Sequence, residues 1–171
     1  MDKKALIKKK ICMLGGYAVG KTSLVRRFVH SIFSEKYHIT IGVKIDKKTV
    51  IIGGQEIKLL LWDIAGEEEC FTIPPSYLKG SDGYLLVIDG TRSTTYDQAL
   101  DIQKRTQKAV GEIPFVVVLN KNDLVDEWKL GKNILDDMRR RNWLLIETSA
   151  KLGTGVEEAF NTIAQKMLSQ S

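Results

Sequence analysis

Short apolar runs alternate along the chain with stretches whose apolar residues recur every three or four positions. The runs are typical of buried strands and the recurring positions of amphipathic helices, so the pattern predicts an α/β domain with a mostly parallel sheet. We expect six strands, over the ranges 11–14, 43–52, 56–63, 84–89, 115–120 and 143–147. The second and third ranges are separated by Gly53, Gly54 and Gln55, which predicts a hairpin and therefore one antiparallel strand.

The helical stretches follow the strands in order, and about five helices are expected to flank the sheet. Apolar residues after Lys21 share one helical face, and a second helix is expected over the range 94–110. Two more helices are marked by Leu130, Ile134, Leu135 and Met138, and by Val156, Ala159, Phe160, Ile163, Ala164 and Met167. Ligands of open α/β sheets bind at the carboxyl ends of the strands, where the motifs below also fall.

Composition narrows the class of protein. The chain has 171 residues, 43% hydrophobic and 27% charged, which favours one folded domain over residues 1–171 and argues against disorder. Cys12 and Cys70 follow no metal-ligand spacing, so we expect a reducing, cytoplasmic location. No apolar run approaches the ~20 residues that span a bilayer.

Basic residues crowd the start of a chain whose net charge is +5. They are Lys3, Lys4, Lys8, Lys9 and Lys10. We favour a solvated start to an edge element, and keep weak attraction to an acidic membrane or nucleic acid as the alternative. The C-terminal KMLSQS carries no cysteine, so we expect no prenyl anchor in this chain.

Residues 15–22, GGYAVGKT, fit the phosphate-loop pattern G-x-x-x-x-G-K-[ST] between a strand and a helix. The glycines allow backbone N–H groups to turn inward, and the helix N-terminus favours an anion. Lys21 is expected to bind the β- and γ-phosphates, and the Thr22 hydroxyl to bind Mg²⁺. The predicted nucleotide contacts here are Gly15, Tyr17, Ala18, Val19, Gly20, Lys21, Thr22 and Ser23. The loop predicts a nucleoside triphosphate without identifying its base.

Two further loops indicate guanine. Asp123 closes an N-K-x-D motif, and its carboxylate accepts from the adjacent N1–H and N2–H₂ of guanine, whereas adenine presents an acceptor there. Asn120 is expected to tie this loop to the phosphate loop, and the stem of Lys121 to lie over the base. The second loop, containing Ser149, Ala150 and Lys151, follows the last strand and is expected to present N–H groups to guanine O6.

With these motifs in order, the chain resembles the Ras superfamily of small GTPases from about Ile7 to Leu168. Its interior is similar to the Rab-like branch at HITIGV (38–43), LWDIAG (61–66) and SYLKG (76–80). The resemblance implies a P-loop NTPase fold, the G domain, and a GTP/GDP switch with slow Mg²⁺-dependent GTP hydrolysis.

The resemblance also implies roles for single residues. Thr40 is expected to ligate Mg²⁺ and sense the γ-phosphate, and Asp63 to hold Mg²⁺ through water, so Thr22, Thr40 and Asp63 are the predicted metal residues. Phe33 is expected beside guanine and Tyr37 over the phosphates. The predicted catalytic residues are Lys21, Thr40, Gly66 and Glu67. Phe33 as a packing residue and Thr40 as an ordinary strand residue are the alternatives.

The chain departs from the family pattern in three ways. Glu67 replaces the water-orienting glutamine, and an ionised carboxylate accepts hydrogen bonds but donates none. Tyr17 replaces a small phosphate-loop residue and adds bulk near the same space. Ile45 and Cys70 replace aromatic residues of the effector surface, so the effector does not carry over from the family.

Three functions are compared. We favour a GTP-hydrolysing switch with slow turnover over a nucleotide-dependent interaction module with little hydrolysis, and Asp123 argues against an ATP-using kinase or ATPase. We expect a monomer that binds protein effectors, and exchange or activating proteins, through residues 33–45 and 62–77. Nucleic acid is not expected as a partner, and membrane contact is expected only through a partner or the basic N-terminus.

Overall fold

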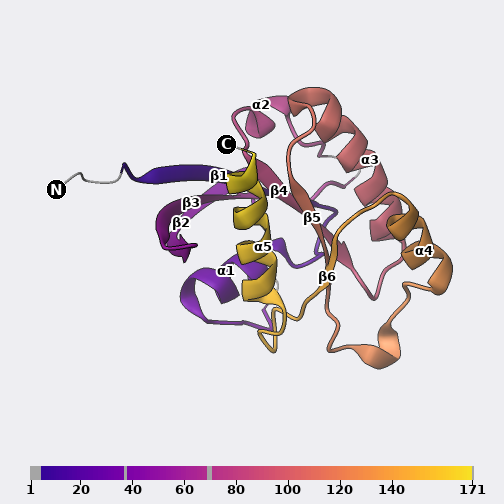
Figure 1. Ribbon diagram of the computed structural model, residues 1–171. Helices are drawn as coiled ribbons and strands as arrows, with labels where there is room; N and C mark the ends of the chain where they lie inside the picture. Colours follow the sequence, from indigo (N-terminus) through magenta and orange to yellow (C-terminus); the bar gives the residue numbers. More distant parts are fainter. Residues whose placement is uncertain (1–4, 37, 69–70, 171) are drawn as a thin grey trace.

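The computed structural model describes residues 5–36, 38–68 and 71–170, which form one six-stranded sheet with helices on both faces (Figure 1). The strands are β1 (Ile7–Gly15), β2 (Val43–Ile52), β3 (Gln55–Ile64), β4 (Gly83–Asp89), β5 (Phe115–Asn120) and β6 (Leu145–Glu147). The helices are α1 (Lys21–His30), α2 (Pro75–Leu78), α3 (Thr94–Val110), η1 (Val125–Glu127, a 3₁₀ turn), α4 (Lys132–Arg140) and α5 (Val156–Ser169).

The strand order is β2-β3-β1-β4-β5-β6. β2 runs antiparallel to β3 and every other neighbouring pair is parallel, which confirms the predicted fold. The β2–β3 turn consists of Gly53 and Gly54 alone, with φ of 57° and 78°, the signs that a two-residue type I′ turn requires. Gln55 was predicted in this turn, but it begins β3 and pairs with Ile52.

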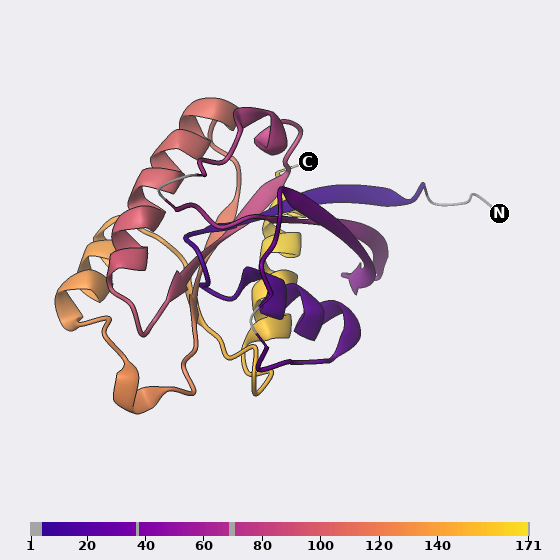
Figure 2. The ribbon, with the colours of Figure 1, turned by 180° about the vertical axis from the view of Figure 1, so that it is seen from behind.

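Each face of the sheet packs against its own set of helices, α1 and α5 on one and α2, α3 and α4 on the other (Figures 1 and 2). On the first face the ring of Phe28 stacks on that of Phe160, with centroids 4.1 Å apart. On the second, Ile102 and Met138 are buried against the sheet. Because β4 lies between both layers, all of its residues are buried, and this explains its continuous apolar run.

β1 differs most from its prediction. It extends from Ile7 instead of Ile11. Residues 7–10 pair with β3 alone, and pairing with β4 begins only at Ile11, so the described part of the basic start lies at an edge, as predicted. Lys3 and Lys4 lie outside the described residues. Lys10, the last of these lysines, is half-buried where pairing with β4 is about to begin. Its ammonium donates to the carbonyls of Tyr77 and Lys79, at 2.7 and 2.8 Å, and lies 3.5 Å from the ring centroid of Trp62.

Two other boundaries were predicted too generously. β6 begins at Leu145 instead of Trp143, because the Trp143 N–H donates to the Met138 carbonyl of α4 and its ring meets Phe115 edge-on. Leu130 was predicted on the fourth helix, but it precedes α4 and is buried from the loop. Both residues pack in the apolar layer of this face, so their predicted burial was correct. Their assignment to a strand and to a helix was wrong.

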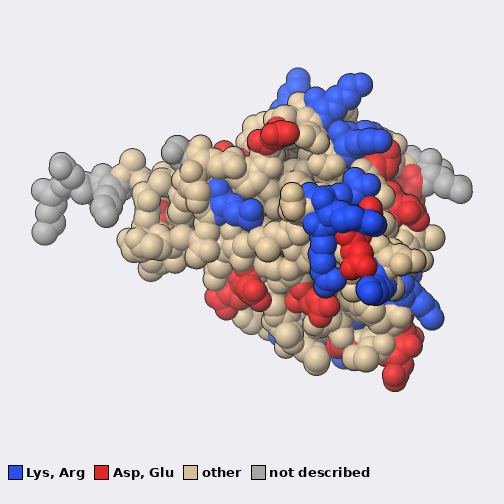
Figure 3. All heavy atoms as spheres, turned by 45° about the vertical axis from the view of Figure 1, so that its right-hand side comes forward, with Lys and Arg blue, Asp and Glu red and all other residues tan. Residues whose placement is uncertain are grey.

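Charge is mixed on the face that carries α3 and α4, where lysine and arginine side chains gather among carboxylates (Figure 3). Arg139, Arg140 and Arg141 form ion pairs with Asp136 or Asp137 one turn away. Among the described residues, no helix combines the length and apolar character needed to cross a membrane.

Candidate nucleotide-binding site

A cavity of about 500 Å³ opens at the carboxyl-end edge of the parallel strands, within the size range of small-molecule sites. The sequence-predicted residues that line it are Tyr17, Ala18, Val19, Gly20, Lys21, Thr22, Ser23, Phe33, Thr40, Gly66, Asn120, Lys121, Asp123, Ala150 and Lys151. Segments far apart in the sequence therefore meet at one site, as the order of the motifs predicted.

Four of the predicted residues do not line the cavity. Each of them forms a hydrogen bond with a residue that does. The Gly15 carbonyl accepts from Lys21 Nζ at 3.2 Å, and the Ser149 hydroxyl donates to Asp123 Oδ1 at 2.8 Å. Asp63 accepts from Thr22, and the backbone of Glu67 exchanges hydrogen bonds with residues 15 and 17. Tyr37 and Cys70 lie outside the described residues.

Lys21 occupies the phosphate end of the cavity and is almost fully buried. Its ammonium donates to the carbonyls of Gly15 and Gly16, at 3.2 and 2.9 Å. Burial lowers the pKa of Lys21 to about 8, although the charges of Asp63 and Glu67 oppose that shift. An anion bound here would favour the charged ammonium, so the site is electrostatically suited to phosphate.

Two glycines let other loops approach the phosphate loop closely. Gly20 has a φ of 103°, and a Cβ there would lie 2.2 Å from Asn120 Nδ2. A Cβ on Gly66 would lie 2.6 Å from both the Gly16 carbonyl oxygen and the Tyr17 Cα. Any side chain at these positions would push the base loop or the segment after β3 away from the phosphate loop.

The three predicted metal residues are joined by hydrogen bonds. Thr22 Oγ1 lies 2.7 Å from Thr40 Oγ1 and donates to Asp63 Oδ2 at 2.7 Å. Among the described residues, Asp63 Oδ1 is the one buried side-chain oxygen or nitrogen without a hydrogen-bond partner. Burial raises the pKa of Asp63, while the Thr22 hydroxyl and Lys21 oppose that shift. Two hydroxyls and one carboxylate fit Mg²⁺, which prefers oxygen ligands and keeps several of its waters.

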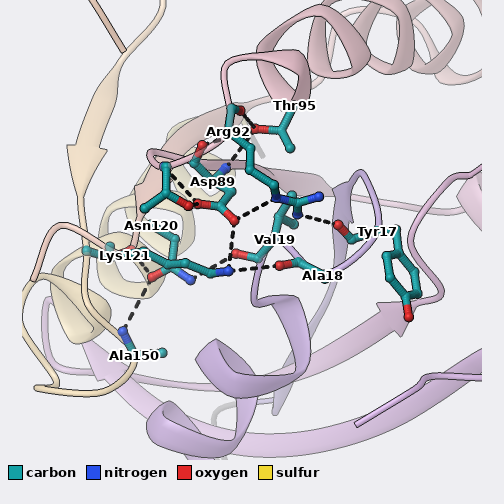
Figure 4. Close-up of polar contacts among 11 residues, drawn as sticks. Tyr17, Ala18, Val19, Asp89, Arg92, Thr95, Asn120, Lys121 and Ala150 are labelled. Atoms are coloured by element: carbon teal, nitrogen blue, oxygen red, sulfur yellow. Dashed lines mark hydrogen bonds and ion pairs between the residues drawn. The ribbon is translucent and has the colours of Figure 1, made fainter. Parts of the chain in front are cut away.

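The base end of the cavity is built by Asn120 and its neighbours. Asn120 Nδ2 donates to the Val19 carbonyl at 3.0 Å, and its Oδ1 accepts from the Thr148 hydroxyl at 3.0 Å. One buried amide thus ties together the phosphate loop and both base loops (Figure 4). The Ser149 hydroxyl fixes the carboxylate of Asp123, which lines the cavity, at the place predicted to read guanine.

Phe33 and Lys151 lie at the rim. Phe33 packs partly against the core beneath α1 and α5 and also lines the cavity, so a contact with a base and a packing role are compatible. Lys151 Nζ forms a 2.9 Å ion pair with Glu35, which links the last base loop to the segment after α1.

The carboxylate of Glu67 is directed to α3 and does not line the cavity. Arg105 donates to Glu67 Oε1 at 2.7 Å, and its second Nη contacts Oε2, a bidentate ion pair. Glu67 Oε1 also accepts from the Ile73 N–H at 2.8 Å. Glu67 raises the pKa of Arg105. The catalytic role predicted for Glu67 stays a prediction.

Asp89 and Arg92 also belong to the surroundings of the site, although neither was predicted from the sequence. Asp89 ends β4 and its side chain is fully buried, and it forms ion pairs with Lys121 and Arg92 (Figure 4). The available signal was a single carboxylate that closes the otherwise apolar strand YLLVI, with an arginine three residues later.

Comparison with known proteins agrees with this geometry. The family model described as "Ras family" matches residues 10–169. The chain is 34% identical to GTP-binding protein ypt1 of Schizosaccharomyces pombe, over 92% of this chain and 79% of that protein. It is 36% identical to Ras-related protein Rab-1 of Theileria annulata, over 92% and 73%. Ras-related protein Rab-13 of Mesocricetus auratus is 35% identical, over 95% and 81%.

Proposed function

The chain belongs to the Ras superfamily as a Rab-like small GTPase, and we propose that its cavity binds GTP or GDP with Mg²⁺ through the residues described above. Family membership makes it a GTP-binding switch protein and a hydrolase acting on GTP. One observation supports the residue assignments most strongly. Lys21, the hydrogen-bonded trio of Thr22, Thr40 and Asp63, and Asp123 all lie in or against one cavity.

In the proposed site, phosphates bind at the end that holds Lys21. Its buried ammonium exchanges two carbonyl contacts for charge-assisted contacts with phosphate oxygens, which are stronger. When bound, Mg²⁺ neutralises charge that develops on the phosphate oxygens. Thr22, Thr40 and Asp63 supply its oxygen ligands or their water contacts, and the backbone N–H of Gly66 is offered to the γ-phosphate.

Guanine selection is assigned to Asp123. The Ser149 hydroxyl occupies one acceptor position of Asp123 Oδ1, so Oδ2 and the remaining lone pair of Oδ1 stay available for the two guanine donors. Adenine presents an acceptor where guanine presents a donor, so the wrong complex would contain two facing acceptors. Displacement of fluorescent GDP by GTP, xanthosine triphosphate and ATP tests this assignment. We expect ATP to compete at least about 100-fold more weakly than GTP, since a site built to pair a polar edge rejects its mismatch strongly.

Asp123→Asn should weaken GTP and admit xanthosine triphosphate, whose extra carbonyl accepts from the new amide. Asp126→Asn is the matched control, because Asp126 is exposed on η1 three residues away and changes charge equally. Equal competition by ATP and GTP in the unmutated protein would overturn the assignment.

Hydrolysis is proposed to be slow without a partner, near the ~10⁻⁴ s⁻¹ of unassisted Ras-type turnover and within about a hundredfold of it. In the described structure Glu67 binds Arg105, and Tyr17 lines the cavity where a partner's arginine would enter. Glu67→Ala should keep nucleotide binding, and Tyr17→Gly should raise turnover. A single-turnover assay with preloaded GTP measures both, and a rate above about 1 s⁻¹ without a partner would contradict this proposal.

Effectors are proposed to bind residues 33–45 and 62–77, next to the γ-phosphate end. Ile39 and Ile41 are 68% and 90% exposed in that region, and Ile45 is exposed beside them. Ile41→Asp should abolish GTP-dependent capture of a partner while leaving GDP affinity unchanged. Ile51→Asp is the control, at another exposed isoleucine near the distant hairpin end. We propose a single-domain, monomeric, cytoplasmic protein without nucleic-acid partners.

A further inference from the structure

The carboxylate of Asp89 lies at the centre of a charged network behind the phosphate loop (Figure 4). It is 2.8 Å from Lys121 Nζ and 3.0 Å from Arg92 Nε, and it accepts from the N–H and hydroxyl of Thr91 at 2.8 and 2.7 Å. We call Asp89, Thr91, Arg92 and Lys121 the outer network. Burial opposes ionisation of Asp89, but these donors outweigh it and lower its pKa, so the carboxylate is charged at neutral pH.

The two cations of the outer network also reach the backbone of the phosphate loop. Arg92 Nη2 donates to the Tyr17 carbonyl at 2.5 Å, and Lys121 Nζ donates to the Ala18 carbonyl at 3.2 Å. The next carbonyl, that of Val19, accepts from Asn120. Successive carbonyls of the loop are therefore bound from the side of β4 and β5, by side chains at the end of β5 or in the loops just after the two strands.

The orientation of these carbonyls fixes the orientation of the neighbouring N–H groups. In a planar trans peptide unit the C=O and the N–H point in opposite directions. When the carbonyls of residues 17, 18 and 19 are bound from behind, the N–H groups of residues 18, 19 and 20 are directed away from the outer network. Residues 17–20 line the cavity, so these N–H groups are offered to phosphate as an anion-binding concavity.

We propose that Asp89 and Arg92 are positioning residues for phosphate binding, in which Asp89 orients Arg92 and Lys121 so that they hold the phosphate-loop carbonyls. This inference rests on the proposed nucleotide site. Neither residue lines the cavity, and both act through backbone that does. Arg92 adds a carbonyl contact, at Tyr17, that the N-K-x-D motif does not supply.

Release of fluorescent GDP in the presence of Mg²⁺ measures the effect. Arg92→Met should speed release about tenfold, the lower end expected for a hydrogen bond from a charged, partly exposed donor. Asp89→Asn should speed it more, ~50-fold, because both cations lose their counter-charge. The double variant should match Asp89→Asn alone, since Arg92 without Asp89 no longer has a fixed position. Arg139→Met, an exposed arginine of α4, is the control and should match wild type.

Ligands that differ in their number of phosphates distinguish a positioning role of Arg92 from a purely structural one. If the loop N–H groups are misdirected, affinity for GDP should fall about tenfold in Arg92→Met while affinity for GMP falls less, since GMP offers one phosphate fewer to the loop. Arg92→Lys should recover part of the loss, because it keeps a charge that can reach Asp89 or the Tyr17 carbonyl.

The outcomes distinguish this inference from the proposed function. Wild-type protein that prefers neither GDP nor GTP over adenine nucleotides would overturn the site itself. Wild-type binding with Arg92→Met within twofold of Arg139→Met, or equal losses for GMP and GDP, would overturn the positioning role alone. Arg92→Met and Arg92→Lys alter a side chain that is 40% exposed, so the test does not depend on the folding of Asp89→Asn.

Discussion

The two segments that flank the phosphate end of the cavity, residues 15–23 and residues 33–42, are held in different ways. Carbonyls of the first segment accept hydrogen bonds from Lys21, Arg92, Lys121 and Asn120. Lys21 begins α1, Asn120 ends β5, and Arg92 and Lys121 lie in the loops just after β4 and β5. The second segment contributes no helix or strand among its described residues. Within it, the Thr40 hydroxyl contacts Thr22, the Gly42 carbonyl accepts from the Ala65 N–H, and Glu35 forms an ion pair with Lys151.

This difference separates a binding element from a sensing element. In the proposed site, the carbonyl contacts of the phosphate loop direct its N–H groups before any ligand arrives, so we expect binding to require little rearrangement. At the phosphate end the segment 33–42 contacts the site through Thr40, whose hydroxyl meets Thr22 where Mg²⁺ is proposed to bind. A ligand that competes for those hydroxyls shifts the second segment and leaves the first in place, the arrangement expected of a switch.

Lys21→Ala, in the binding element, should cause the largest loss of nucleotide affinity. It removes the charge that faces the phosphates and leaves the carbonyls of Gly15 and Gly16 without this donor. Several charge-assisted contacts are lost together, so affinity for GDP and GTP should fall about 1,000-fold by calorimetric titration. Lys129→Ala, at an exposed lysine before α4, is the control. A loss under tenfold for Lys21→Ala would place the phosphates elsewhere.

Thr22→Asn should affect both elements, because Thr22 belongs to the binding element and its hydroxyl contacts the sensing element. The substitution removes a hydroxyl that meets both Thr40 and Asp63. We expect Mg²⁺-GTP to weaken about 100-fold, and GDP distinctly less, because only GTP engages the Thr40 segment through its γ-phosphate. Chelation with EDTA should speed release of GDP from wild type and much less from the variant. Release insensitive to EDTA in wild type would contradict the metal site.

Arg105→Met tests how the segment that follows β3 is attached to α3. It removes the bidentate partner of Glu67, whose carboxylate also accepts from the Ile73 N–H. Amide hydrogen exchange over residues 71–78 should rise about tenfold, the response expected when a local contact that opposes opening is lost. Lys104→Met, exposed on the same helix, should leave exchange unchanged. Unchanged exchange in Arg105→Met would mean that the ion pair does not fix this segment.

The fold was predictable because two kinds of periodicity were clear. The helix over Thr94–Val110 and the strand over Phe115–Asn120 have the predicted bounds, since each carries an uninterrupted pattern. β1 was cut short because its first half is rich in lysine. Local polarity does not reveal that a neighbouring strand pairs with Ile7 and that a carbonyl pair binds the Lys10 ammonium.

The cavity was predictable for a different reason. Residues such as Lys21 and Asp123 belong to motifs whose spacing is typical of direct contact with a nucleotide, the contact that we propose here. Asp89 and Arg92 act on the backbone of another loop, 75 residues away for Arg92 and Tyr17, and a single sequence carries no spacing rule for that contact. The direction of the Glu67 carboxylate could not be predicted for the same reason, because its partner Arg105 lies 38 residues later, on α3.

The smallest expected effect concerns the acid stability of the binding element. The outer network lowers the pKa of Asp89, so the folded state binds a proton there less readily than the unfolded chain does. The stability that this carboxylate contributes is fully present above its ordinary pKa, about 3.9, and is lost as pH falls through the lowered folded value. Asp89→Asn removes that contribution at neutral pH while keeping one acceptor oxygen, so we expect a loss of about 1 kcal/mol. Urea unfolding of both proteins at pH 7, 5 and 3 should show this difference at the first two values and a smaller one at the third. A difference that grows on acidification would mean that the carboxylate is protonated in the folded state, and that Arg92 and Lys121 do not depend on its charge.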